Sequence, residues 1–405
     1  MTDPANRFLP YGRHQVDDDD IAAVVSVLRS DSLTGGPVVA EFERAFAERV
    51  GARFAVACAN GTAGLHLATL ALGLEPDDAV IVPTLTFLAT ANAARYVGAE
   101  VIFSDVDPAT GLMRPSDMQD ALARETGWKI KAVLPVHLNG QCVDMESVAE
   151  FAGRHGLRVI EDACHAIGAA YRTRSGEEVP VGSCRHSDMT VFSLHPVKTI
   201  AMGEGGVVTT NDPVLHDRLL RLRNHGMTRD QQCFVERQQA FDKAGLPNPW
   251  YYEMPELGYN YRASEIHCAL GLSQLHKLDR FLARRRELAD IYDKELALLA
   301  PVIRPVPSRN LESDGWHLYT ILIDFSAAGT SRGTVMRRLA QSGIGTQVHY
   351  IPVHLQPYYR YRYGESHLAG ALSYYERTLS LPLYPGMHDE DVDRVVFTLK
   401  QVLAG

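Results

Sequence analysis

Short apolar runs alternate with helix-like segments along the first half of the chain. Runs that end in polar or glycine residues predict β-strands at 53–58, 79–83, 100–106, 130–136, 157–162 and 188–193, with one further strand at 205–212. Several runs are apolar almost throughout, as expected of parallel strands that helices cover on both faces. Between them lie patterns such as TAGLHLATLALG (62–73), in which Gly73 marks the end of a helix. The alternation predicts an open, mostly parallel α/β sheet.

The pattern changes after about residue 250. A long helical pattern covers 262–299, a strand is predicted at 317–325, and 390–405 is an amphipathic helix with Val392, Val396 and Leu399 on one face. Because 405 residues are too many for one small core, we predict two domains. Residues 1–250 form a large α/β domain with an N-terminal arm, and residues 251–405 form a smaller α+β domain. Segment 229–250 is polar and poorly periodic, which indicates a loop or insertion.

Composition and charge narrow the class of protein. Apolar residues make up 46% and charged residues 22% of the chain, which is ordinary for a globular protein. The formal net charge of −9, without a dense Lys/Arg block, argues against nucleic-acid binding. No apolar run reaches the roughly 18–20 residues that a membrane span needs. Six scattered cysteines without a C-x-x-C pair, and a start unlike a signal peptide, predict a cytoplasmic location. The histidines lack metal-ligand spacing, so no metal site is expected.

Several residues with ligand-binding chemistry directly follow predicted strands. In an open α/β sheet, ligands bind beyond the carboxyl ends of the strands. Gly61 and Thr62 open the helix after the first strand, where free amides and a hydroxyl favour an anion such as phosphate. Asp162 ends the strand 157–162, and Phe87 follows the second strand. Taken singly, the cradle is better explained as a helix cap and Phe87 as a core aromatic, and a buried salt bridge explains Asp162 at least as well as a ligand does.

Lys198 lies in the stretch FSLHPVKTIAMGEGG (192–206), and most lysines are simply solvated. An anion cradle, a stacking aromatic, a carboxylate and a lysine, each beyond a different strand, together describe a pyridoxal phosphate site. A lysine with the ordinary pKa of about 10.4 must be desolvated, or lie near positive charge, to act as an amine at neutral pH. The apolar neighbours of Lys198 favour desolvation, and Ser193 offers the phosphate another hydroxyl. We therefore predict that Lys198 is a nucleophile.

Five longer motifs resemble those of a known enzyme family. They are NGTAGLHLA, PTLTFLATANAARYVGAEVIFSDVD, EDACHAIGA, TVFSLHPVKTIAMGEGG and ELGYNYRASEIHCALGLSQL. Together they resemble the nucleotide-sugar aminotransferases of the DegT or StrS family over nearly the whole chain. The resemblance implies the aspartate-aminotransferase-like fold, fold type I of the pyridoxal phosphate enzymes. YGR near the start, PWYYEMPELGYNYR and TQVHYIPVHLQPYY are most similar to the branch of pseudaminic acid biosynthesis.

The resemblance also assigns roles to residues. It implies that Lys198 binds the cofactor covalently and later moves the proton, and that Asp162 keeps the pyridine nitrogen protonated. Gly61, Thr62 and Ser193 would bind the phosphate, and Phe87 would cover the ring. His165 stands where many members carry glutamine, and it would bond the phenolic oxygen. Asn260 would reach the phosphate from the neighbouring subunit of a homodimer. The sugar nucleotide would contact a further set of residues: Tyr11, Asp31, Ser32, Leu33, Thr34, Gln347, Val348, His349 and Tyr350.

The implied reaction has two stages. L-Glutamate would convert pyridoxal phosphate to pyridoxamine phosphate, and the amine would then pass to C4 of a UDP-linked 4-keto-6-deoxy-N-acetylhexosamine. One lysine serves both halves because they are the same proton transfer run in opposite directions. We hypothesise that segment 229–250, which precedes PWYYEM, is a lid over the sugar nucleotide.

Three other functions are consistent with the same fold. A sugar dehydratase of this superfamily would carry histidine in place of Lys198, so the lysine argues against it. A regulatory or sensor protein would be expected to lose Lys198 or Asp162, and both are present. An aminotransferase acting on another keto sugar, of the perosamine type or ketonised at C3, is the main competitor, since sequence does not reveal the shape of the pocket.

Overall fold

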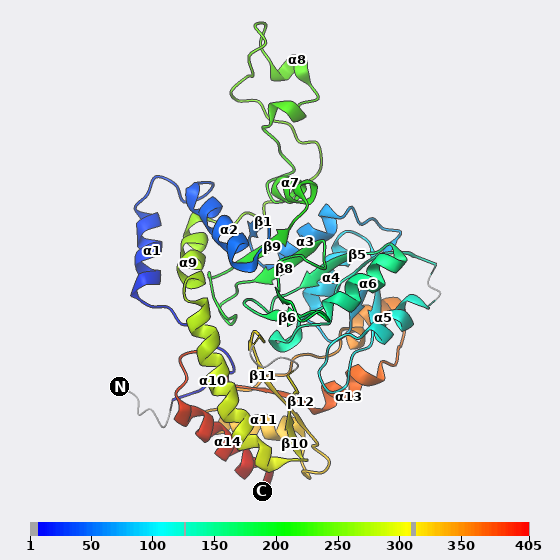
Figure 1. The fold of residues 1–405 in the computed structure, drawn as a ribbon, viewed down its shortest axis with the longest axis vertical. Coiled ribbons are helices and arrows are strands. Elements are labelled where there is room, and N and C mark those ends of the chain that lie inside the picture. The colour runs from blue at the N-terminus through cyan, green and yellow to red at the C-terminus, as the bar shows by residue number, and fades with distance from the viewer. Residues whose placement is uncertain (1–6, 125–126, 309–312, 405) are drawn as a thin grey trace.

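A seven-stranded sheet forms the centre of the protein. The computed structural model describes residues 7–124, 127–308 and 313–404 (Figure 1). The strands are β1 (Phe54–Cys58), β2 (Asp78–Pro83), β3 (Glu100–Ser104), β4 (Lys129–Val133), β5 (Arg158–Asp162), β8 (Met189–Ser193) and β9 (Gly206–Thr210), in the order β1-β9-β8-β5-β4-β2-β3. Strand β9 pairs antiparallel with both of its neighbours, β1 and β8, and the other strand pairs of this sheet are parallel. The predicted α/β fold with a mostly parallel sheet is therefore confirmed, and the seven predicted strands all form.

Helices cover this sheet, and short polar side chains begin several of them. They are α2 (Pro37–Val50), α3 (Gly61–Ala71), α4 (Leu88–Tyr96), α5 (Pro115–Leu122), α6 (Met145–His155) and α7 (Pro213–Leu222). Asn60 caps α3 by accepting a bond of 2.8 Å from the Ala63 amide, and Asp144 caps α6 in the same way. All residues of β2, β3 and β9 are buried, as strands covered on both faces must be. A two-stranded ribbon of β6 (Ala170–Arg172) and β7 (Glu178–Pro180) follows β5.

A second, smaller core contains an antiparallel sheet of β10 (Ile303–Pro305), β11 (Tyr319–Ile323) and β12 (Thr378–Leu381). Helices α11 (Arg332–Gln341) and α14 (Asp389–Ala404) belong to the same hydrophobic cluster. The division into domains at residue 250 stays a prediction. Segments after that residue contribute to both cores: α9 (Glu265–Leu275), α12 (Pro357–Tyr363) and α13 (Ala369–Arg377) place side chains in the larger cluster. At the other end, α1 (Asp18–Leu28) packs on α9.

The single long helix predicted over 262–299 is wrong in one respect. The structure divides it into α9 and α10 (Leu278–Leu296), with a break at His276 and Lys277. At the break the Lys277 amide bonds to the Gln274 carbonyl, three residues back instead of four. The α-helical hydrogen-bond pattern is therefore interrupted by a tighter, 3-10-like turn before α10 begins. Figure 1 shows α10 running from the large core into the small one, and its residues enter both hydrophobic clusters.

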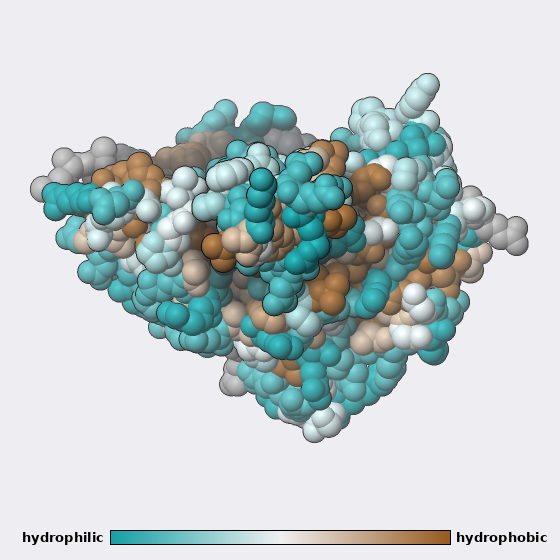
Figure 2. Space-filling view, turned by 90° about the horizontal axis from the view of Figure 1, so that it is seen from above, coloured by the Kyte–Doolittle hydropathy of each residue, from teal (hydrophilic) through white to brown (hydrophobic). Residues whose placement is uncertain are grey.

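Residues 229–250 project far from the body of the molecule (Figure 1). The segment holds α8 (Arg237–Ala240) and a turn of 3-10 helix, and Glu256 anchors its base by ion pairs of 3.0 and 3.1 Å with Arg218 and Arg221. Large apolar side chains are exposed along it and its base: Val235, Leu246, Trp250, Tyr252, Met254 and Leu257. Figure 2 shows hydrophobic and hydrophilic side chains mixed on the face from which the segment projects. Throughout the described ranges, every helix is too short or too polar to cross a membrane.

Candidate active site

One large pocket, with a volume of about 660 Å³, opens beyond the carboxyl ends of β1, β2, β5 and β8. It brings together most of the residues predicted from the sequence: Tyr11, Gly61, Thr62, Phe87, Asp162, His165, Ser193, Lys198, Gln347, Val348, His349 and Tyr350. These residues come from segments that are far apart along the chain. Their convergence is what an open α/β sheet produces at its ligand-binding edge.

The first turn of α3 forms an anion cradle at one end of the pocket. The Asn60 side chain caps the Ala63 amide, and within the described chain the amides of Gly61 and Thr62 bond to no protein acceptor. A Cβ atom on Gly61 would lie 2.9 Å from Cβ of Ser193, so only glycine lets the β8 end approach the helix this closely. Two free amides and the hydroxyl-bearing residues Thr62 and Ser193 therefore line this end of the pocket, which suits a phosphate group.

The Asp162 carboxylate is buried at the end of β5 and is held through both oxygens. Thr90 donates to Oδ2 at 2.6 Å, and the Cys164 amide donates to Oδ1 at 3.1 Å. Each oxygen keeps a further lone pair for a partner in the pocket. A buried carboxylate without a cationic partner is costly, so this arrangement suits a protonated ring nitrogen.

Lys198 follows β8 and reaches the same pocket. Burial lowers the pKa of its amine, while Cys164 and Asp162 act in the opposite direction more weakly. The neutral amine is thereby more populated than in a solvated lysine. The predicted desolvation is the larger of these effects, and it favours Lys198 as a nucleophile.

The side chains of His165 and Tyr350 contact each other in the pocket. Their side chains are joined at 2.9 Å, between Nε2 and the phenolic oxygen. Burial, followed by the nearby Lys198 and His349, holds the pKa of His165 well below its ordinary value. Burial and Lys198 likewise lower the pKa of His349 to about 3. Both imidazoles are therefore neutral at physiological pH.

Phe87 stands at the start of α4 with 55% of its surface exposed. Its ring centroid lies 6.0 Å from that of Tyr350. An aromatic ring exposed to this degree at a pocket wall can cover a flat ligand without any rearrangement of the core.

Some predicted residues do not line the pocket of their own chain. Asp31, Ser32, Leu33 and Thr34 connect α1 to α2, where the Leu33 carbonyl accepts from the Glu265 amide. Asn260 is exposed and pairs with Asn224. Segment 229–250 contributes no described residue to this pocket, so it does not cover the site of its own chain.

The structure also adds residues that the sequence did not reveal. Thr86, Glu204 and Gln356 line the pocket, and Thr90 donates a hydrogen bond to Asp162. Thr86, which precedes the N-cap residue Phe87, and Thr90, in the first turn of α4, bond to each other at 2.6 Å. Nothing local in the sequence indicates that Asp162 is a further partner of Thr90.

The model of the DegT/DnrJ/EryC1/StrS aminotransferase family matches residues 14–400. The chain belongs to this family. The spore coat polysaccharide biosynthesis protein SpsC of Bacillus subtilis is 39% identical over the full length of both chains. PseC of Helicobacter pylori, an aminotransferase involved in pseudoaminic acid biosynthesis, has a TM-score of 0.85 at 27% identity, over 98% of this chain and 100% of PseC. Spr1654 of Streptococcus pneumoniae, described as a putative sugar aminotransferase and solved in its pyridoxal phosphate form, has a TM-score of 0.85 at 27% identity. The match covers 98% of this chain and 99% of Spr1654.

This DegT-family protein is a pyridoxal phosphate-dependent sugar aminotransferase, and its fold is that of PseC. The site fits the cofactor. The Gly61 cradle suits the phosphate, and the Asp162 carboxylate, which has hydrogen-bond donors but no ion pair within the described residues, suits the ring nitrogen. When bound, the cofactor supplies an electron sink that stabilises negative charge on the substrate carbon.

Proposed function

We propose that this enzyme transfers an amino group from L-glutamate to C4 of a UDP-linked 4-keto-6-deoxy-N-acetylhexosamine. This is the reaction of a UDP-4-amino-4,6-dideoxy-N-acetyl-β-L-altrosamine transaminase, which makes an amino sugar for pseudaminic acid or a related surface glycan. The similarity to PseC over the whole chain is the observation that carries the proposal. The 660 Å³ pocket also agrees with a ligand larger than an amino acid.

Lys198 performs the proton transfers in this proposal. Its amine would bind the cofactor between turnovers. When released, it would take a proton from the donor carbon and pass it to the cofactor, and in the second half-reaction it would move a proton in the opposite direction, to the sugar carbon. The depressed pKa keeps a usable fraction of the amine neutral. Asp162, held by Thr90 and Cys164, retains the proton on the ring nitrogen throughout.

His165, Phe87 and the Gly61 cradle position the cofactor rather than react. His165 donates to the phenolic oxygen, and Phe87 covers one face of the ring. Thr62 and Ser193 add hydroxyl contacts to the phosphate. Tyr11 and the stretch Gln347 to Tyr350, which line the outer pocket, contact the sugar nucleotide.

A homodimer with shared sites is part of the proposal. Among the described residues that line the pocket, Lys198 is the only lysine or arginine, whereas Asp162 and Glu204 are acidic. A nucleoside diphosphate and the carboxylates of glutamate favour cationic donors such as arginine, and the described lining offers none besides Lys198. We therefore infer that a second subunit supplies them, together with the exposed Asn260 and the loop Asp31 to Thr34.

The projecting segment 229–250 supports the same arrangement. It projects from the body of the molecule (Figure 1), contributes no described residue to its own pocket and exposes apolar side chains, which suits contact with a second copy. In the dimer this segment covers the sugar nucleotide of the partner's site. Its deletion is expected to raise the Michaelis constant for the sugar, and an unchanged constant in a dimeric deletion variant would contradict the role.

Single-turnover spectroscopy with a substrate panel tests the proposed function. L-Glutamate is expected to shift the visible band of the purified protein to the near ultraviolet, and the correct keto sugar to restore it with release of an aminated product of the expected mass. The panel contains UDP- and TDP-linked sugars ketonised at C3 or C4, and Lys198→Ala is the control. Turnover only with a C3-keto or TDP-linked sugar would favour the alternative aminotransferases, and no response to any amino donor would favour a regulatory protein.

A further inference from the structure

The hydrogen bonds of His165 define its tautomer. The backbone amide of Asn139 donates to Nδ1 of His165 at 3.3 Å. An Nδ1 atom that accepts a hydrogen bond carries no proton, so the proton of the neutral ring is on Nε2. Nε2 is the atom that faces Tyr350 at 2.9 Å, inside the pocket.

In the described part of the chain, the groups around His165 offer no anionic partner for a charged ring. Lys198 and His349 act on it electrostatically, and its ring centroid lies 6.3 Å from that of His349 and 4.4 Å from that of His317. None of these groups is an anion that would stabilise an imidazolium, and Tyr350 is held neutral because burial raises its pKa well above the ordinary value. His165 is thus a neutral hydrogen-bond donor, and the Asn139 amide determines that its proton is on Nε2.

Asn139 presents that amide from a left-handed turn. Its φ is 63° and its ψ is −2°, a conformation that asparagine tolerates better than most residues. The side-chain nitrogen of Asn139 donates to the Tyr374 hydroxyl at 3.0 Å, which fixes the turn from the other side. The next residue, Gly140, has φ of 98°, and a Cβ there would lie 2.8 Å from the amide nitrogen of Trp316. The turn therefore has little freedom to move.

His137 connects this turn to β5. Its backbone amide donates to the Asp162 carbonyl at 3.0 Å, and its Nε2 lies 2.8 Å from the Glu161 carboxylate. The Val143 amide donates to its Nδ1 at 3.1 Å, so Nε2 carries the proton and donates to Glu161. The loop after β4 is thus bonded to two successive residues of β5.

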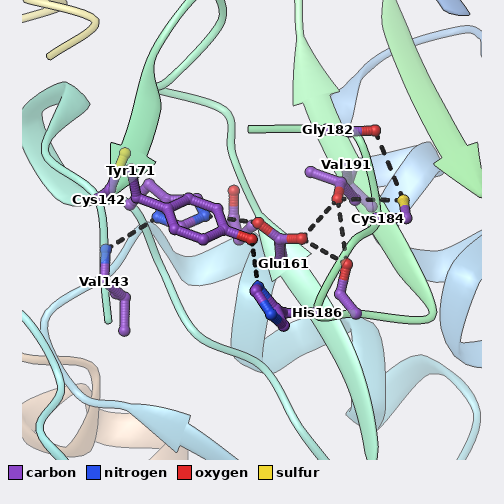
Figure 3. A network of polar contacts seen from close by, with 12 residues as sticks. Cys142, Val143, Glu161, Tyr171, Gly182, Cys184, His186 and Val191 are labelled. Carbon is purple, nitrogen blue, oxygen red and sulfur yellow. Dashed lines mark hydrogen bonds and ion pairs between the residues drawn. The ribbon is translucent and has the colours of Figure 1, made fainter. Parts of the chain in front are cut away.

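Glu161 forms the centre of a buried network on the side of the sheet away from the pocket. Successive side chains of a strand point to opposite faces, so Glu161 and Asp162 project in opposite directions. Besides His137, the carboxylate accepts from Ser187 and, at 2.9 Å, from Thr190. Figure 3 shows Glu161 between Val143 at one end of the network and Cys184 at the other.

We propose that His137 and Asn139 are positioning residues that hold His165 as a neutral imidazole, with its Nε2–H directed into the cofactor pocket. The Glu161 network holds His137 in place. His137 and Tyr374 in turn hold the turn that contains Asn139, and the Asn139 amide sets the tautomer of His165. The consequence is that His165 donates a hydrogen bond at the phenolic oxygen of the cofactor and does not take up a proton there. The contact to that oxygen rests on the proposed function, whereas the tautomer does not.

Nitrogen NMR of the cofactor-free protein, labelled with ¹⁵N-histidine, tests the tautomer directly. The signals of His165 are assigned by their loss in His165→Gln. Wild type is expected to show a protonated Nε2 and a bare Nδ1 that stay unchanged around neutral pH. Asn139→Ala strains the left-handed turn and loses the bond to Tyr374, so the two tautomers are expected to mix. Asn139→Gly keeps the left-handed conformation and the amide but also loses the bond to Tyr374, so its His165 signals are expected to change less than those of Asn139→Ala.

Tyr374→Phe provides a second test that removes one hydroxyl and leaves the core filled. It is expected to broaden or shift the His165 signals, and unchanged signals in both folded Asn139→Ala and Tyr374→Phe would overturn the proposal. If Asn139→Ala does not fold, Tyr374→Phe decides alone.

The contact to the cofactor has its own readout. In the loaded enzyme, the pH midpoint of the visible band is expected to shift upward in His165→Leu, which keeps no hydrogen-bond donor at this position, and by a smaller amount in Asn139→Ala. A midpoint unaffected by His165→Leu would reject the contact to the phenolic oxygen while the NMR result on the tautomer still stands.

Discussion

The hydroxyl of Thr90 donates a hydrogen bond of 2.6 Å to Oδ2 of Asp162. Thr90 lies in α4, 72 residues before the carboxylate, and its hydroxyl also bonds to Thr86 at 2.6 Å. The bond orients the carboxylate so that the remaining lone pairs face the pocket. Thr90 therefore belongs to the binding machinery of the ring nitrogen, although it does not line the pocket itself.

Replacing Thr90 by valine removes this bond and keeps the volume of the side chain. Hydrogen bonds to charged groups contribute about 1.5–3 kcal/mol, which corresponds to a loss of roughly 10- to 100-fold in kcat/KM. Steady-state kinetics with L-glutamate measures the effect. Thr69→Val is the matched control, because Thr69 is equally buried and bonds to the His66 carbonyl at 2.8 Å away from the pocket. Equal losses in both variants would show that Thr90 acts through stability alone.

Gly61→Ala is expected to weaken cofactor binding. The added Cβ would lie 2.9 Å from Cβ of Ser193, so the cradle must open and the phosphate loses part of its contacts. Fluorescence titration of the cofactor-free protein with pyridoxal phosphate measures the dissociation constant. Gly153→Ala is the control, since nothing lies within 4 Å of a Cβ at that helical position and alanine stabilises a helix by about 0.5–1 kcal/mol. Unchanged affinity in Gly61→Ala would exclude the proposed cradle.

The rate at which pyridoxal phosphate reacts with the protein is expected to rise with pH through a midpoint below the ordinary lysine range. Burial lowers the pKa of Lys198, and only the neutral amine attacks the aldehyde. Stopped-flow absorbance of the visible band, recorded across pH, gives the midpoint. Borohydride reduction followed by peptide mass spectrometry confirms that Lys198 is the residue modified. A midpoint at the ordinary lysine value would show that the pocket does not depress the pKa.

Glu161→Gln is expected to destabilise the protein by about 1–3 kcal/mol at neutral pH, because it replaces the acceptor of a buried network. Burial raises the pKa of Glu161, but the bonds from His137, Ser187 and Thr190 outweigh burial and leave it below the ordinary value. A carboxylate with a lowered folded pKa stabilises the fold above its unfolded pKa of about 4.3, and this stability is lost as pH falls through the folded pKa. The difference between wild type and variant in urea unfolding should therefore shrink in acid, and a constant difference would contradict the assignment.

Much of the fold and part of the site could be predicted from the sequence, for a physical reason. Apolar runs and the residues after them are local, and a parallel sheet gathers its strand ends at one edge, which brought Gly61, Asp162 and Lys198 together in the pocket. Hydrogen bonds between distant segments leave no such local pattern, so the support of Asp162 by Thr90 and of His165 by Asn139 was not predicted.

Other features depended on chain geometry that the sequence does not display. The helical pattern at 262–299 continues through the break at His276 and Lys277, because tightening by one residue scarcely disturbs the apolar spacing. Asp31 to Thr34 lie outside the pocket of their own chain, although a loop of that composition was consistent with sugar binding. Contributions from a second subunit are likewise invisible in a single sequence.

Helix α10 packs in both hydrophobic cores, which links the unfolding of one core to that of the other. Leu278, Phe281 and Leu282 are packed in the large core, whereas Leu288, Tyr292 and Leu296 are packed in the small one. One uninterrupted helix therefore packs in both cores. Unfolding of either core would disrupt the helix on which the other core depends. Heating should therefore give one calorimetric transition instead of two. Rotation of the small core relative to the large one is limited by how far α10 can bend.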